Sequence, residues 1–404
     1  MSRRAARLAL VPLFLLALSL CSGWPANATP KFPYPWPDYS VVPILFVPTD
    51  WSVSGDEVTA EAAALRSALH EIQRFYGDNN TGHTFTLNPL QVVQANGPKE
   101  AYHIIWNGRN IYEDGVEFDG NMEAAVVREL HDRGYPTPEA QNESGYSSLI
   151  FVKGAGGWAG GREFPEADGG WAILGDWAID SIQGQVPEGA YWWSGRRIQT
   201  GAAAHELGHT FDLPHPDAYG GAWDSTVMGY FWLYPAAGLN DHDRATLLGE
   251  KLNFFARTAV GSVSQVAVTK GTMIAGGPTA LSADDDVYQQ VRSTVSRTTS
   301  WDGRFTGVPN TLRRLELTYK GSNSQACTQT VQVWSWRTSA WVRVDRRTVA
   351  TSEVEIIKPA PGDAPADYVS GTIGAGDLRL RVRCHGRFPF TANGDLLKIV
   401  YDRS

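Results

Sequence analysis

The stretch that decides the local fold runs from residue 205 to residue 215 and reads His-Glu-Leu-Gly-His-Thr-Phe-Asp-Leu-Pro-His. On a helix, positions i and i+4 lie on one face, so His205 and His209 can bind the same metal ion. A catalytic zinc ion takes three protein ligands and keeps a fourth position for water. His215 can be the third ligand if the helix ends soon after His209. Asp212 and Pro214 favour that ending, because proline cannot continue a helix and Asp tolerates left-handed backbone.

Glu206 follows the first of these histidines, where its carboxylate can reach a water molecule activated by the metal. The whole pattern resembles the metzincin metalloproteases, whose motif is H-E-x-x-H-x-x-G-x-x-H followed by a methionine turn. The resemblance implies that Met228, in Thr-Val-Met-Gly-Tyr, is the turn methionine. It also implies that Tyr230 lies near the zinc, as a tyrosine does in astacin-like and serralysin-like members. Asp212 departs from the motif, since the family usually has glycine there.

The order of predicted elements agrees with this resemblance. Val41 to Val47 is an apolar, β-branched run that predicts a buried strand, and Ser54 to about Tyr76 predicts a helix that opens with a capping box. A second helix is expected over 122–133, a central strand over 148–153, and an active-site helix from about Ser194 to His209. A last helix is expected from Arg244 to about Arg257. The predicted fold class is therefore an α+β zincin-like (metzincin) catalytic domain with a mixed twisted sheet, over residues 29–260.

Residues 154–175 are rich in glycine and tryptophan. We interpret them as a mobile loop that leads into an edge strand, Trp171 to Leu174. By resemblance, metzincins pair such an edge strand with an extended substrate. The alternative is that Trp158, Trp171 and Trp177 only anchor the core and the loop.

The amino-acid composition changes near residue 260. Residues 261–404 show short alternating strands typical of a β-sandwich or jelly roll. Trp334, Trp336 and Trp341 could stack on sugars, although cross-strand packing is the favoured alternative. The acidic run 284–286 could bind calcium, with a solvated loop as the favoured alternative. The other histidines show no ligand spacing and are interpreted as ordinary residues. Asp217 could orient a ligand imidazole or form a turn.

The N-terminus predicts a secretory leader over residues 1–28, with three arginines, an apolar run and Ala-Asn-Ala before the expected cleavage after Ala28. Lipid anchoring through Cys21 is disfavoured because the preceding Leu20 is large. The chain has 404 residues and a formal net charge of −8, and the predicted leader removes only positive charges. An acidic chain of this kind is a poor nucleic-acid binder. In an oxidising compartment, Cys327 and Cys384 are expected to pair as a disulfide.

These observations predict a secreted, monomeric zinc endopeptidase with one catalytic zinc ion, a protein or peptide substrate and no transmembrane segment. His205, His209 and His215 would hold the zinc, and Glu206 would be the general base. Tyr230 would ligate zinc, stabilise the oxyanion or only pack the turn. Two alternatives stay open. One is a zinc hydrolase of a non-peptide amide, and the other is a glycan-binding or matrix-binding protein whose zinc domain is vestigial.

Overall fold

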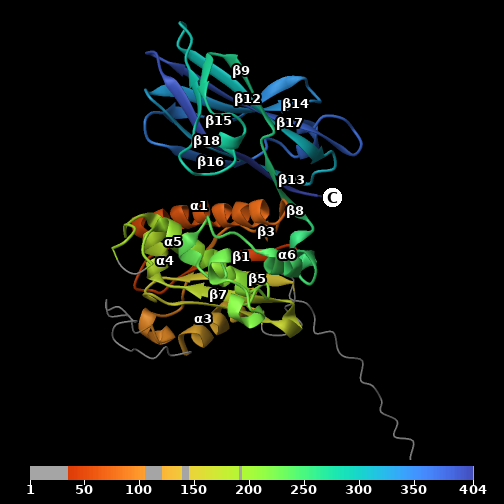
Figure 1. Ribbon diagram of the computed structural model, residues 1–404. Helices are drawn as coiled ribbons and strands as arrows, with labels where there is room; N and C mark the ends of the chain where they lie inside the picture. Colours follow the sequence, from red (N-terminus) through yellow and green to blue (C-terminus); the bar gives the residue numbers. More distant parts are fainter. Residues whose placement is uncertain (1–34, 105–120, 139–144, 191–192, 404) are drawn as a thin grey trace, which may run out of the picture.

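The computed structural model describes residues 35–104, 121–138, 145–190 and 193–403 (Figure 1). The predicted leader and Cys21 therefore lie outside the described residues. In the described part of the chain, no helix combines the length and the apolar character needed to cross a bilayer. The N-terminal half forms one sheet with helices on both faces, and the C-terminal half forms two further sheets.

The first sheet has six strands and is parallel except at one edge. Its central strands are β1 (Ser40–Val47), β5 (Tyr146–Val152) and β7 (Gly169–Leu174), which pair in parallel in that order. On the far side of β1 lie the short strands β3 (Thr86–Leu87) and β4 (Gln91–Gln94). The last strand, β6 (Ala159–Phe164), is antiparallel to β7 and forms the edge.

The central strands β1 and β7 are buried on both faces, which explains the apolar run Val41–Val47 in β1 and the apolar residues 171–174 in β7. Successive side chains of β1 point to opposite faces, so Val41 and Leu45 enter one core while Val42 and Phe46 enter the other. One core lies under α1 (Asp56–Asn79), α4 (Asp176–Gln183) and α5 (Arg196–His209). The other core is covered by α3 (Asn121–Asp132) (Figure 1).

Most predicted helices exist, but their ends differ from the expectation. Helix α1 begins after Gly55, which makes no side-chain cap hydrogen bond, so the predicted capping box is not formed. The active-site helix α5 begins after Gly195 rather than at Ser194, whose hydroxyl donates to Pro187 O instead. The expected last helix is split into α6 (Asp241–Leu248), capped by Asn240 in a capping box, and the short α7 (Leu252–Phe255).

The C-terminal half is built from strands β8 to β18. A seven-stranded sheet contains β2 (His83–Thr84), β8 (Thr258–Ser262), β10 (Thr272–Ala275), β11 (Gln289–Arg292), β13 (Arg314–Asn323), β16 (Val354–Pro359) and β18 (Thr391–Asp402). A five-stranded sheet has the order β15 (Ala340–Val349), β14 (Cys327–Ser335), β17 (Ala375–Gly386), β12 (Thr298–Pro309) and β9 (Gln265–Lys270). The two sheets share one apolar core that includes Trp301, Leu317 and Leu380.

The predicted fold class is wrong. Strands make up 37% of the protein and helices 27%, arranged in several sheets, so the protein is mostly β and not an α+β zincin-like fold. The prediction took the class of the segment 29–260 from a motif that covers only residues 205–230. The helical spacing of the motif carries no information on strand pairing. It does not indicate, for example, that β2 of the N-terminal half pairs with β8 of the seven-stranded sheet.

Helix α1 joins the two halves (Figure 1). The guanidinium of Arg74, 5% exposed, lies 3.1 Å from Glu355 of β16 and also reaches Thr318 of β13. Asp78 pairs with Lys398 of β18 at 2.6 Å. All these partners belong to the seven-stranded sheet, so its outer face is covered by α1.

Candidate metal centre

Helix α5 brings His205 and His209 to one face, one helical turn apart. Behind them, Ala202 to Ala204 are fully or almost fully buried, and small helix-forming residues let the helix pack closely there. The helix ends at His209, and Asp212 then takes a left-handed conformation with φ of 60°. Leu213 N donates to Gly208 O at 3.1 Å, which closes the turn and brings His215 back toward the helix.

The three histidines form an almost regular triangle. The Nε2 atoms of His205 and His209 are 3.1 Å apart, those of His209 and His215 are 3.2 Å apart, and those of His205 and His215 are 3.1 Å apart. Tetrahedral zinc with Zn–N bonds of about 2.0–2.1 Å needs nitrogen atoms separated by about 3.3 Å. The triangle therefore fits one zinc ion held by three imidazoles.

Backbone carbonyls fix two of these rings. Nδ1 of His205 lies 2.9 Å from Val227 O, and Nδ1 of His209 lies 2.8 Å from Leu213 O. A neutral imidazole that donates from Nδ1 keeps its lone pair on Nε2, which is the atom that faces the other histidines. Burial, followed by the charge of neighbouring histidines, lowers the pKa of His205 to about 3 and that of His209 to about 4. Both rings are thus neutral metal donors at ordinary pH.

Glu206 lies beside the triad and against the edge strand β6. Burial raises the pKa of Glu206 to about 8, while a hydrogen bond from the backbone of Gly161 acts in the opposite direction. A dication nearby would favour the ionised carboxylate. An ionised carboxylate at this place can accept a proton from a water molecule and return it.

Gly161 explains how β6 comes so close to α5. A Cβ atom at this position would lie 2.2 Å from Glu206 O, which is far inside van der Waals contact. Only glycine allows this approach. The sequence analysis did not identify Gly161 as a site residue. The only sequence signal for this close approach is the Gly160-Gly161 pair within the glycine-rich stretch.

The interpretation of residues 154–175 is corrected in two respects. The segment is not a loop, because it contains the strand β6 and the 3-10 turn Pro165–Ala167. The edge strand is β6, whereas Trp171 to Leu174 belongs to β7 and lies between β5 and β6. The continuous apolar character of β7 agrees with an interior strand, and the glycines and charges of β6 agree with an edge.

Met228 is fully buried directly beneath α5. A Cβ atom on Gly208 would lie 2.4 Å from Met228 Sδ, so the helix and the methionine turn are in close contact. The turn is held by a hydrogen bond from Thr226 Oγ1 to Asp243 and by Val227 N donating to Gly238 O at 2.8 Å. Thr226 and Asp243 are site residues that the motif did not reveal. Asp217 is the second residue of the short 3-10 helix Pro216–Tyr219, and among the described residues it makes no hydrogen bond to His205, His209 or His215.

Tyr230 is one of several aromatic side chains around the triad. Its ring stacks on Trp232 at a centroid distance of 4.5 Å and lies 6.3 Å from Trp223. Trp223 in turn lies 5.6 Å from the ring of His215. The role predicted for the Tyr230 hydroxyl, whether ligand, oxyanion donor or packing group, stays a prediction.

The other predicted sites lie in the C-terminal half. Cys327 and Cys384 lie on the neighbouring strands β14 and β17, and their side chains hydrogen-bond, but both are free thiols in this structure. The predicted disulfide is therefore not formed here. Asp284 gathers with Glu353 and Asp395, and the ammonium group of Lys320 binds all three carboxylates. Calcium at this cluster stays a prediction.

Trp334 and Trp341 are cross-strand neighbours with ring centroids 5.3 Å apart. The packing alternative describes this pair, while Trp336 remains exposed at 37%.

Comparison with known proteins adds little to what the geometry of the histidine site shows. No protein-family model matches the chain, and no curated protein matches it. The wild-type OgpA structure from Akkermansia muciniphila has 16% identity and a TM-score of 0.35, covering 84% of this chain and 88% of that chain. Catalytically inactive OgpA from the same organism, in complex with an O-glycopeptide (glycodrosocin) substrate, has 15% identity and a TM-score of 0.34, covering 82% and 87%.

A carbohydrate-binding structure described as CBM4 has 11% identity and a TM-score of 0.23, covering 35% of this chain and 92% of its own. Likenesses of this strength assign no activity to the chain. The assignment therefore depends on the residues of the site.

Proposed function

We propose that the protein is a zinc-dependent hydrolase that cleaves peptide bonds. The observation that carries this proposal is the triangle of Nε2 atoms on His205, His209 and His215, with Glu206 directly beside it. The resemblance of the motif to metzincin proteases motivates the choice of peptide bonds. The predicted leader makes an extracellular protein or peptide the expected substrate.

Each residue would have a distinct role. When bound, zinc would supply Lewis acidity toward water and toward the scissile carbonyl. The histidines would present neutral nitrogen donors whose orientation is fixed by Val227 O and Leu213 O. Glu206 would take a proton from the attacking water and return it to the leaving amine, a role worth about 10²–10⁴ in rate. Met228 would hold the floor of the site without binding the metal.

The edge strand β6 supplies the second part of the proposal. Its outer edge pairs with no other strand of the described sheet, and Gly161 N bonds to Glu206, so an extended chain lying along β6 would pass close to the general base. Pairing of a substrate with an exposed strand is a recurring mode of peptide recognition. This geometry favours an unfolded peptide over a compact small amide.

The decisive experiment compares Glu206→Gln with the wild-type protein. Glu206→Gln should lower kcat/KM on an unstructured protein by about 10²–10⁴-fold while one zinc ion per chain is retained. Glu250→Gln, at an exposed position remote in sequence from the motif, is the control and should keep full activity. Full proteolysis by Glu206→Gln would refute the mechanism.

Two further measurements complete this experiment. Absence of stoichiometric zinc in the purified wild-type protein would refute the metal site. Cleavage of non-peptide amides alone, in the same panel of substrates, would select the alternative hydrolase.

A further inference from the structure

The outer face of the five-stranded sheet carries a second feature that hydrolysis does not use. Along β17, burial alternates with a period of two. Leu378, Leu380 and Val382 are fully buried, while the side chains between them point outward. These outward side chains are Arg379, Arg381, Arg383 and His385, and Arg387 follows directly.

The neighbouring strands extend this basic surface. Arg383 lies opposite Thr330 of β14, and Thr330 lies opposite Arg346 of β15, so two arginines flank one threonine across the sheet. Neighbouring strands are about 4.8 Å apart, which puts the two arginine Cα atoms about 10 Å from each other. Arg343 is the next outward arginine on β15 and lies opposite Gln332.

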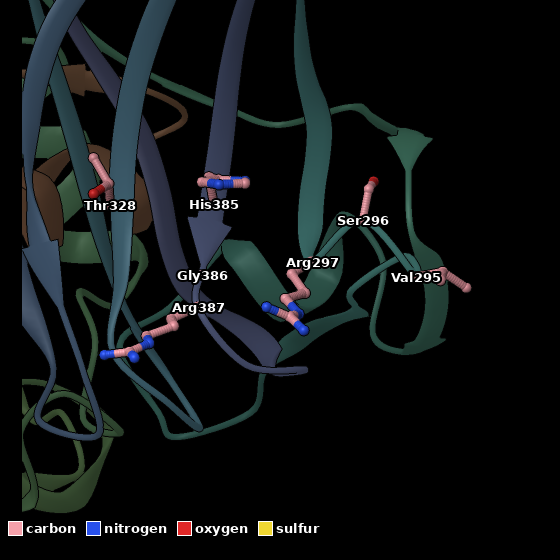
Figure 2. Close-up of a pocket in the computed structure, with 7 residues that line it drawn as sticks. All are labelled: Val295, Ser296, Arg297, Thr328, His385, Gly386 and Arg387. Atoms are coloured by element: carbon pink, nitrogen blue, oxygen red, sulfur yellow. The ribbon is translucent and has the colours of Figure 1, made fainter.

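A pocket of about 630 Å³ lies at one end of this row of basic side chains (Figure 2). Its lining includes Arg297, Thr328, His385 and Arg387. Figure 2 shows Arg297 and Arg387 on either side of Gly386, and Gly386 N donates to Arg297 O at 3.0 Å. The backbone therefore holds the two guanidinium-bearing residues at one place.

Five arginines of this surface are exposed to solvent. In the part of the chain that the structure describes, no ion pair is formed by Arg297, Arg343, Arg346, Arg383 or Arg387. We call these five residues the arginine face. Near its other end the charges are balanced, because Asp302 binds Arg379 at 3.0 Å and Arg381 at 2.6 Å. The unbalanced charge thus gathers in one area of a protein whose net charge is −8.

We propose that the arginine face binds an acidic polysaccharide through its sulfate or carboxylate groups. Arginine donates in a planar fork that matches both of these anions, and a cluster without internal partners attracts a ligand that carries repeated negative charge. The hydroxyl and amide side chains between the arginines, on Thr328, Thr330 and Gln332, can bond to sugar hydroxyl groups.

The same surface suits nucleic acid poorly. Single strands are bound by stacking bases on open aromatic rings, but the face of Trp341 is covered by the guanidinium of Arg381, 4.0 Å from its centroid. Trp334 meets Trp341 at an angle of 66° and offers no shared stacking platform. A broad five-stranded sheet also cannot enter the major groove of a duplex, which admits a helix or a two-stranded ribbon.

The test measures binding of the full chain to four immobilised probes: dextran sulfate, polygalacturonate, neutral dextran and single-stranded DNA. We expect salt-sensitive binding to one or both acidic polysaccharides and none to neutral dextran. The triple variant Arg346→Gln/Arg383→Gln/Arg387→Gln should weaken that binding by roughly 10- to 100-fold. Arg383→Gln alone should weaken it by about threefold.

The control is Arg128→Gln/Arg257→Gln/Arg313→Gln, which removes the same charge from three exposed arginines outside this sheet. It should change the affinity less than twofold, and thermal melting should show that every variant is folded. The proposal is overturned if neither acidic polysaccharide binds, if the control weakens binding as much as the triple variant, or if neutral dextran binds equally well. It is also overturned if DNA binds more tightly than both polysaccharides at the same salt concentration.

Discussion

Gly161→Ala is the substitution that most directly tests how the site is assembled. The added Cβ atom would lie 2.2 Å from Glu206 O, 2.9 Å from Glu206 C and 3.1 Å from Glu206 Cα. All three are helix backbone atoms, so no side chain can rotate away. A carbon–oxygen contact needs about 3.3 Å, so β6 and α5 must separate by about 1 Å.

The chain supplies a matched control one residue earlier. A Cβ atom on Gly160 would lie 3.5 Å from Glu123 Oε1 and 3.8 Å from Trp158 Nε1, which are ordinary contacts. Gly160→Ala should therefore be neutral or should stabilise the strand by up to about 1 kcal/mol, because glycine is unfavourable inside a strand. Gly161→Ala should lower the free energy of unfolding by about 1–3 kcal/mol, which is the usual cost of overpacking.

Activity should separate the two variants further. A displacement of about 1 Å at a catalytic group costs on the order of 10² in rate, so kcat/KM of Gly161→Ala should fall by about that factor. Zinc affinity should not change, because the histidines are oriented by Val227 O and Leu213 O rather than by β6. The assays are urea unfolding, zinc titration and cleavage of a labelled unstructured protein. Equal behaviour of the two alanine variants would refute the close packing of β6 on Glu206.

Two further predictions concern pH and the junction between the halves. Burial raises the pKa of Asp176 from 3.8 to about 6, so the folded state binds this proton more tightly, and stability from this group should fall by about 3 kcal/mol as pH rises from about 4 to about 6. In urea unfolding of the chelator-treated protein, the free energy of unfolding of Asp176→Asn should not show this fall. If the difference in free energy of unfolding between wild type and Asp176→Asn does not change with pH, the prediction is wrong. Arg74→Ala should lower the free energy of unfolding by about 2–4 kcal/mol because it leaves Glu355 without its buried partner. Additivity with Glu355→Gln in a double-mutant cycle would show that the pair does not couple α1 to β16.

The ligand set could be predicted from the sequence because its geometry is local. His205 and His209 are one helical turn apart, and the turn that returns His215 is encoded within six residues. The groups that orient the rings could not be predicted in this way. Val227 O and Leu213 O are backbone atoms, which any residue would supply, so they leave no trace in the sequence.

The sequence also does not show which segments, far apart along the chain, come into contact in the fold. Gly161 is 45 positions before Glu206, and only the packing of β6 on α5 shows why a glycine stands there. The same reason explains the wrong edge strand, since strand order within a sheet depends on pairing partners and not on the composition of one strand. The fold class failed for a related reason. The motif covers only residues 205–230, but it was used to assign the fold class of the whole segment 29–260, whose strand pairing it does not encode.

The arrangement of the sheets connects the two proposals. The seven-stranded sheet turns its outer face to α1, where Glu316, Glu355 and Lys398 meet His70, Arg74 and Asp78. The five-stranded sheet packs its inner face on the other sheet, so the arginine face lies on the side of the sandwich away from α1. A polysaccharide bound there would not cover the histidine triad. The triple arginine variant should therefore keep wild-type kcat/KM on a small soluble peptide. It should lose only the increase in cleavage rate that the wild-type protein gains when it is bound to an acidic matrix.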